Sequence, residues 1–230
     1  MVTVLILAGG LAKRLKKFKL KIPKSLVKVA GKPFIAHQLE ELSRQGIQDV
    51  VLCIGHLGKQ IEEYVGDGSI FGLKVRYSRE SENLLGTGGA VRKALHLLDE
   101  SFFILYGDSW LDINYKEVWE AFKNSNCPAL MTIYFNNDLF DKSNIEMNED
   151  SIKLYSKKNL NDRMTHIDYG LGIMSSEIIK LYPEGVKFDL SEVYEKLSKK
   201  DHLAKFETTK RFYEIGSPSG LIELDHYLSF

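Results

Sequence analysis

Three short apolar runs, separated by segments of helical periodicity, predict a parallel β-sheet in the first half of the chain. The runs are rich in β-branched residues, as strands buried on both faces usually are, and they cover residues 2–7, 50–54 and 102–106. Apolar residues recur at helical spacing over residues 34–47, where Gly46 suits the position that ends a helix. A second helix is expected over residues 90–98, entered through the glycine-rich residues 86–89. This alternation indicates an α/β fold with helices on both faces of a mostly parallel sheet.

The second half of the chain has a mixed pattern. We expect strands over residues 129–135 and 167–174, and a hairpin over residues 143–155 that turns at 148–150. The remaining expected elements are helices over residues 176–182, 189–199 and 217–228 and a strand over 211–215. The sequence therefore predicts a single domain of residues 1–230, in which a nucleotide-type half, residues 1–125, is followed by a half, residues 126–230, that completes a pocket.

Composition excludes several function classes. The 230 residues include 31 Lys and Arg against 31 Asp and Glu, so the formal net charge is zero and argues against nucleic-acid or membrane-surface binding. No apolar stretch reaches the roughly 18 residues of a membrane span, and the apolar start lacks the basic region of a signal peptide. With only two cysteines, Cys53 and Cys127, a disulfide framework is excluded, and we expect a cytoplasmic protein.

Two of three candidate sites lie just after the first predicted strand, and ligands of open parallel sheets bind at such strand ends. Gly9 and Gly10 let backbone N–H groups approach phosphate closely, although residues 7–15 match neither a Walker A motif nor GxGxxG. Nine Lys or Arg then fall between residues 13 and 32, with no Asp or Glu before residue 40. This segment favours binding of a polyanion. The planar guanidinium of Arg14 would bind phosphate oxygens with its forked donors, and the Lys24 ammonium would act as a point charge. The alternatives are a tight turn and a solvated basic loop.

The third candidate is Asp108, which follows the third predicted strand. A rigidly presented carboxylate is a suitable Mg²⁺ ligand, whereas the alternative is a turn or helix-capping aspartate. Asp112 is a weaker candidate that could equally cap the following helix. A second acid would be needed from Asp168, Glu192 or Glu214, and Glu214 stands out as a charge within a predicted strand. None of the six histidines has HxH or HExxH spacing, which argues against zinc.

Six motifs occur in order along the chain: Leu7-Ala8-Gly9-Gly10 with Arg14-Leu15, Pro23-Lys24-Ser25-Leu26-Val27, Gly31-Lys32-Pro33, Leu85-Gly86-Thr87-Gly88-Gly89, Gly107-Asp108 and Glu214-Ile215-Gly216-Ser217-Pro218. Together they closely resemble the motifs of the sugar-phosphate nucleotidylyltransferases, over essentially the whole chain. The resemblance implies a Rossmann-like three-layer α/β/α nucleotide-diphospho-sugar transferase fold without a C-terminal β-helix domain. It also implies transfer of a nucleoside monophosphate from an NTP to a sugar 1-phosphate, with release of pyrophosphate.

The same resemblance implies roles for individual residues. Arg14 would bind the leaving pyrophosphate, Lys24 would stabilise the α-phosphate, and Asp108 with Glu214 would hold Mg²⁺. The nucleotide would contact Leu7, Ala8, Gly9, Gly10, Leu11, Arg14, Lys24, Leu85, Gly86, Thr87 and Asp108. The sugar phosphate would contact Gly107, Ser109, Asp168, Tyr169 and Gly170. Such a reaction needs no general base, because the attacking oxygen already belongs to a phosphate, and alignment with charge neutralisation then carries catalysis.

The sequence departs from the family at three points and leaves some alternatives open. Ala12-Lys13 replaces Gly-Thr in the phosphate loop, Glu214 replaces Asp, and residues 168–170 read Asp-Tyr-Gly where many relatives have Asn-Ala-Gly. Glu80 and Glu82 before the Leu-Gly-Thr-Gly-Gly motif look most like guanylyltransferases acting on mannose- or heptose-type 1-phosphates. Uridylyl or cytidylyl transfer, a non-catalytic binding relative and a homodimer stay open, whereas a dinucleotide oxidoreductase lacks its fingerprint.

Overall fold

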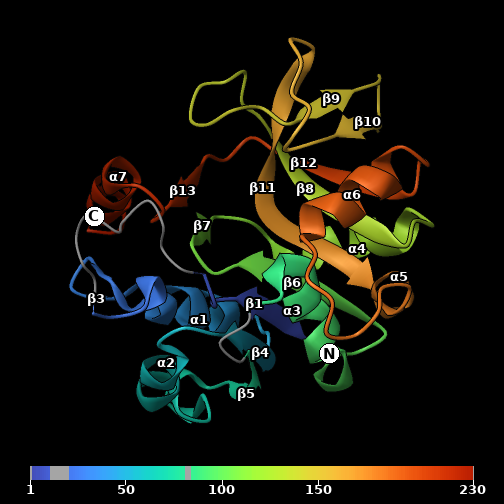
Figure 1. Ribbon diagram of the computed structural model, residues 1–230. Coiled ribbons are helices and arrows are strands. Elements are labelled where there is room, and N and C mark those ends of the chain that lie inside the picture. Colours follow the sequence, from blue (N-terminus) through green and yellow to red (C-terminus); the bar gives the residue numbers. More distant parts are fainter. Residues whose placement is uncertain (1, 11–20, 81–83, 230) are drawn as a thin grey trace.

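A β-sheet runs through the centre of the molecule in the computed structural model, which describes residues 2–10, 21–80 and 84–229 (Figure 1). Within these ranges the sheet has nine strands, and its main path has the order β10-β9-β11-β6-β1-β4-β5, with β8 joined to β11 and β12 joined to β8. The four strands β6, β1, β4 and β5 are parallel, and β11 pairs with β6 in the antiparallel direction. The bounds are β1 Val4–Leu7, β4 Asp49–Ile54, β5 Lys74–Arg79, β6 Ser101–Tyr106, β8 Ala129–Phe135, β9 Ile145–Met147, β10 Ile152–Tyr155, β11 Met164–Ser175 and β12 Leu203–Thr208.

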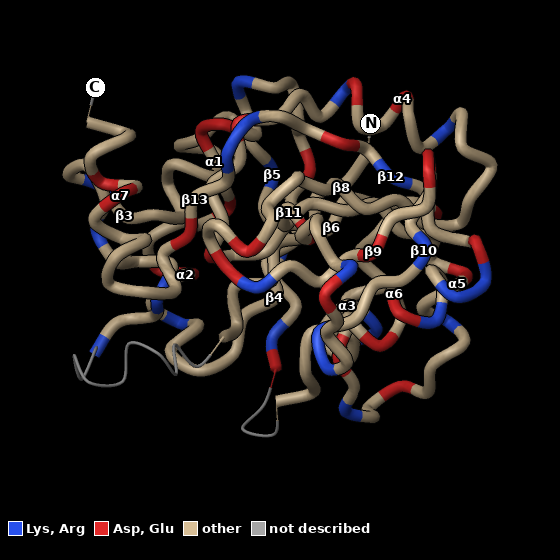
Figure 2. The backbone as a smooth tube through the Cα atoms, turned by 90° about the horizontal axis from the view of Figure 1, so that it is seen from above, with Lys and Arg blue, Asp and Glu red and all other residues tan. Residues whose placement is uncertain are grey.

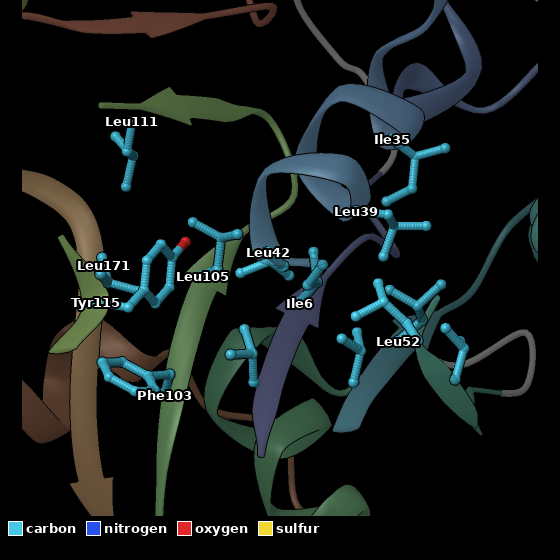
Figure 3. Close-up of a cluster of buried hydrophobic side chains, with 14 of the residues drawn as sticks. Ile6, Ile35, Leu39, Leu42, Leu52, Phe103, Leu105, Leu111, Tyr115 and Leu171 are labelled. Carbon is cyan, nitrogen blue, oxygen red and sulfur yellow. The ribbon is translucent and has the colours of Figure 1, made fainter. Parts of the chain in front are cut away.

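Helices cover both faces of this sheet, as the strand pattern predicts. Alternate residues of β1 pack against the helices on opposite faces of the sheet: Val4 and Ile6 on one face and Leu5 on the other. The first layer contains α1, α2 and α4, and Figure 3 shows Ile35, Leu39 and Leu42 of α1 packed over the strands. The second layer contains α3, α5 and α6. The bounds are α1 Phe34–Arg44, α2 Gly58–Val65, α3 Gly86–Ala94, α4 Tyr115–Asn124, α5 Ser176–Lys180, α6 Leu190–Ser198 and α7 Pro218–Leu228. The three-layer α/β/α fold is confirmed.

Two small strand pairs and α7 build the edge of the molecule beside the carboxyl ends of the sheet. β7 (Ser109–Leu111) pairs with β13 (Phe212–Glu214), and β2 (Lys28–Val29) pairs with β3 (Lys32–Pro33). A separate apolar cluster of Val29, Phe34, Ile215 and Leu224 joins α7 to both pairs. A 3₁₀ turn over Lys24–Leu26 precedes β2. Segments from opposite ends of the chain therefore meet at one edge.

Most predicted elements are present, and two local expectations are wrong. The glycine-rich motif does not lead into a helix that starts at Ala90, because α3 already begins at Gly86. Asp112 does not cap the helix that follows it. Asn114 caps α4 by accepting from two backbone N–H groups, whereas Asp112 pairs with Lys210 at 2.7 Å.

Charges of both signs occur along the described chain, in line with a formal net charge of zero. Lys and Arg are interspersed with Asp and Glu along the described chain (Figure 2). No helix in the described ranges combines the length and apolar character that crossing a membrane requires. Of the basic segment expected over residues 13–32, the part up to residue 20 lies outside the described residues.

Candidate active site

A first cavity, of about 280 Å³, lies at the carboxyl ends of β1, β4 and β6. This position is the one expected for a ligand site in a parallel sheet. Eight of the residues predicted to contact a nucleotide line it: Leu7, Ala8, Gly9, Gly10, Lys24, Gly86, Thr87 and Asp108. Leu84, rather than the predicted Leu85, lines the wall there, while Leu85 turns its backbone N–H to the carboxylate of Glu80. The predicted Leu11 and Arg14 lie outside the described residues.

A second cavity, of about 420 Å³, adjoins the first and shares Tyr106 and Asp108 with it. Its lining includes five of the predicted residues: Ser109, Asp168, Tyr169, Gly170 and Glu214. Gly107, which was expected on the sugar side, instead lines the first cavity. A Cβ added at Gly107 would lie 2.5 Å from the backbone oxygen of Leu7, so only glycine fits this close approach of β6 to β1.

Lys24 and Asp108 meet where the two cavities join. Lys24 Nζ lies 2.7 Å from Asp108 Oδ2, and the lysine side chain is 14% exposed against 46% for the aspartate. Lys24 is the first residue of the 3₁₀ turn that follows Pro23, and this turn fixes the backbone position from which its side chain extends. A largely buried ammonium beside an accessible carboxylate is well placed to meet phosphate oxygens entering from either cavity.

Glu214 is held beside Asp108 by backbone pairing. Ile215 donates its N–H to the carbonyl oxygen of Asp108 at 3.0 Å, and the register of β13 and β7 sets Glu214 opposite Ser109. The Glu214 carboxylate accepts from Gly216 N, from Ser217 N at 3.2 Å and from Ser217 Oγ at the start of α7. These hydrogen bonds hold the side chain of Glu214 against the start of α7.

The donor set at this junction fits Mg²⁺. Asp108 and Glu214 supply hard carboxylate oxygens, and Mg²⁺ is commonly bound by one or two carboxylates together with water and substrate phosphate. Within the described ranges no group of three or more His, Cys, Asp or Glu residues is arranged to hold a metal.

Glu80 marks the far end of the first cavity. Its Oε1 accepts from Leu85 N at 2.7 Å, and a Cβ added at Gly9 would lie 3.2 Å from its Oε2, so the carboxylate faces the glycine loop. Burial raises the pKa of the Glu80 carboxyl above its usual value. Thr87 ties the start of α3 to α6, because its Oγ1 accepts from Leu190 N at 2.8 Å. Glu82, the other acid noted before this motif, lies outside the described residues.

Tyr106 and Lys157 are among the residues of the second cavity that sequence reasoning missed. Lys157 Nζ lies 3.8 Å from Asp168 Oδ2 and 5.0 Å from the centre of the Tyr106 ring. Tyr106 is the last residue of β6, where a buried strand and a cavity wall give the same pattern in the sequence. Lys157 and Lys158 are consecutive in a polar stretch. Nothing in the sequence shows that Lys157, rather than Lys158, lines the cavity.

The chain is similar to several known proteins. A family model described as nucleotidyl transferase matches residues 3–143. A D-glycero-alpha-D-manno-heptose 1-phosphate guanylyltransferase from Campylobacter jejuni is 28% identical over 214 residues, which are 93% of this chain and 94% of that protein. An N-acetylmuramate alpha-1-phosphate uridylyltransferase from Neisseria meningitidis is 37% identical over 118 residues, 51% of each chain. The crystal structure of HddC from Yersinia pseudotuberculosis complexed with GMP-PN is 27% identical, with a TM-score of 0.82 over 99% of this chain and 100% of that one.

Proposed function

The chain belongs to the nucleotidyl transferase family, and from this premise we propose that it transfers a nucleoside monophosphate from an NTP to a hexose or heptose 1-phosphate. The observation that carries the proposal is the pair of adjoining cavities that share Tyr106 and Asp108, with the Lys24 ammonium paired to Asp108. Two phosphorylated substrates, one in each cavity, would bring their phosphates together at this junction. Catalysis by alignment requires such an arrangement.

The junction supplies what an in-line displacement at phosphorus needs. An oxygen of the sugar phosphate attacks the α-phosphorus, the bond from the α-phosphorus to the bridging oxygen breaks, and pyrophosphate leaves. The attacking oxygen is already ionised, so a general base is not required. In this proposal Lys24 stabilises the charge that develops on the α-phosphate, and the backbone N–H groups of Gly9 and Gly10 orient the triphosphate. Arg14 remains our candidate for the pyrophosphate.

We propose that Asp108 and Glu214, which both line the second cavity and lie on backbone segments joined by the β7 and β13 pairing, would hold Mg²⁺. When bound, the ion would polarise the α-phosphate and neutralise the leaving group. The protein's own contribution is to hold both carboxylates in place, Asp108 through its carbonyl and Glu214 through the start of α7. The Lys24 ammonium stays within reach of the same phosphate.

The second cavity is proposed as the acceptor site. Lys157 presents an ammonium group there, which suits the phosphate of a sugar 1-phosphate. Ser109, Asn144 and the backbone at Gly170 offer polar groups on the walls, and Tyr169 and Leu160 offer apolar surface. Polar and apolar groups together are typical of sites that bind one face of a sugar ring while hydrogen-bonding its hydroxyls.

For the base we propose guanine. Its Watson–Crick edge presents two adjacent donors, N1–H and the N2 amino group, which a carboxylate can accept together. Glu80 places such a carboxylate in the first cavity. Similarity to a guanylyltransferase and to a structure that contains GMP-PN supports this choice. The similarity to a uridylyltransferase keeps UTP as the alternative donor.

Glu80→Gln tests the choice of base. The amide keeps an oxygen for Leu85 N but turns an NH₂ group toward the guanine donors, so we expect kcat/KM for GTP to fall roughly 10- to 100-fold relative to that for UTP. Steady-state kinetics with both nucleotides at one fixed sugar 1-phosphate measure this ratio. Glu63→Gln, on the exposed face of α2, is the matched control. An unchanged GTP-to-UTP ratio would remove Glu80 from base recognition.

A further inference from the structure

Asp168 is a nearly buried acid at the wall of the second cavity. Its side chain is 5% exposed, although the cavity wall includes it. Oδ2 accepts from the hydroxyl of Tyr106 at 3.1 Å and from that of Tyr155 at 3.5 Å. Oδ1 accepts from Gly170 N at 3.1 Å. Both carboxylate oxygens therefore already accept hydrogen bonds from the protein, and the 5% exposure leaves little of the group open to a sugar hydroxyl.

Lys157, whose side chain is 45% exposed, pairs with this acid. The ammonium lies 3.8 Å from Asp168 Oδ2 and 5.0 Å from the centre of the Tyr106 ring. Tyr106 lines both cavities, and Lys157 lines the second. Burial raises the pKa of Tyr106 well above its usual value, so its hydroxyl stays protonated and keeps donating to Asp168.

We propose that Asp168 is a positioning residue, which acts on the sugar phosphate only through Lys157. The hydroxyls of Tyr106 and Tyr155 fix the carboxylate, and the carboxylate then fixes the flexible lysine over the Tyr106 ring. An ammonium has three donors, so it can keep Asp168 and bind a phosphate oxygen at the same time. The inference rests on the proposed function, because it requires an acceptor phosphate in the second cavity.

A double-mutant cycle between Asp168→Asn and Lys157→Met tests this assignment. The readouts are KM for mannose 1-phosphate, KM for GTP, kcat and the melting temperature of each variant. We expect either single change to raise KM for mannose 1-phosphate about tenfold, which corresponds to one well-placed ionic contact, while KM for GTP stays unchanged. The double variant should match Lys157→Met, because a residue that acts through Lys157 has no effect once Lys157 is gone.

Lys158→Met is the matched control, since Lys158 adjoins Lys157 but pairs with Glu192 on the surface at 2.9 Å. Tyr155→Phe tests the same inference if Asp168→Asn lowers the melting temperature. It removes one hydrogen bond to the Asp168 carboxylate at a residue that does not line the second cavity. Its smaller rise in KM should also vanish in the Lys157→Met background. If the increases in KM for mannose 1-phosphate multiplied in the double variants, Asp168 would contact the sugar directly. That result would overturn this inference but not the proposed function. Absence of pyrophosphate release by the wild-type protein would overturn the proposed function, and this inference with it.

Discussion

Asp108→Asn should lower kcat by roughly a thousandfold in a protein that still folds. Asp108 lines both cavities, pairs with the Lys24 ammonium and provides one of the two carboxylates proposed for Mg²⁺. Asparagine keeps the shape of the side chain but loses the charge that binds a divalent cation. The backbone carbonyl that receives Ile215 N is unchanged, so the junction of β7 and β13 should persist.

Pyrophosphate release at saturating substrate measures this effect, and binding of Mn²⁺ to the protein provides a second, independent readout. Asp112→Asn is the control, because Asp112 lies four residues further along and pairs with Lys210 at the surface. If Asp108→Asn turned over at nearly the wild-type rate, neither the metal assignment nor the position of the reaction centre would stand.

Lys24→Met should lower kcat by about a hundredfold to a thousandfold, which is typical for loss of one group that stabilises charge in a transition state. The Lys24 side chain is 14% exposed, so its ammonium acts in a partly desolvated site where charge interactions are strong. Methionine fills a similar volume without the charge. KM for the nucleotide should change much less than kcat, because the proposed contact strengthens as the α-phosphate reacts.

Lys28→Met is the matched control for Lys24, since Lys28 belongs to the same basic segment and is exposed on β2. Melting curves are needed for both variants, because Lys24→Met leaves Asp108 without its ion-pair partner. A variant that kept kcat and changed only KM for the nucleotide would assign Lys24 to ground-state binding and contradict its proposed role.

The parallel part of the sheet was predictable because strands buried on both faces leave a plain signal. β1, β4 and β6 are continuous apolar runs, whereas β5 at the edge carries Lys74, Arg76 and Arg79 and was missed. A strand that pairs on one side only can expose alternate charged residues, and its sequence then resembles a loop. The nucleotide loop and Asp108 were found for the same reason, since each directly follows a predictable strand.

The second cavity was less predictable, because it depends on contacts between distant segments. Glu214 was predicted as the second acid of the metal site, but only the pairing of β13 with β7 brings its segment beside that of Asp108. Lys157 is one of two consecutive lysines, and the path of the chain after β10 decides which one faces the cavity. Asp168 was identified from its motif, whereas its two tyrosine partners come from β6 and β10. Such networks have no short-range sequence signature.

The most direct test of the central claim is a panel that crosses GTP, UTP, CTP and ATP with several sugar 1-phosphates and follows pyrophosphate release. We predict release that requires Mg²⁺ and both substrates, is greatest with GTP and a mannose- or heptose-type 1-phosphate, and is matched mole for mole by an NDP-sugar. Nucleotide-dependent thermal stabilisation without pyrophosphate release from any pair would contradict the account, because it would identify a binding protein that does not catalyse nucleotidyl transfer.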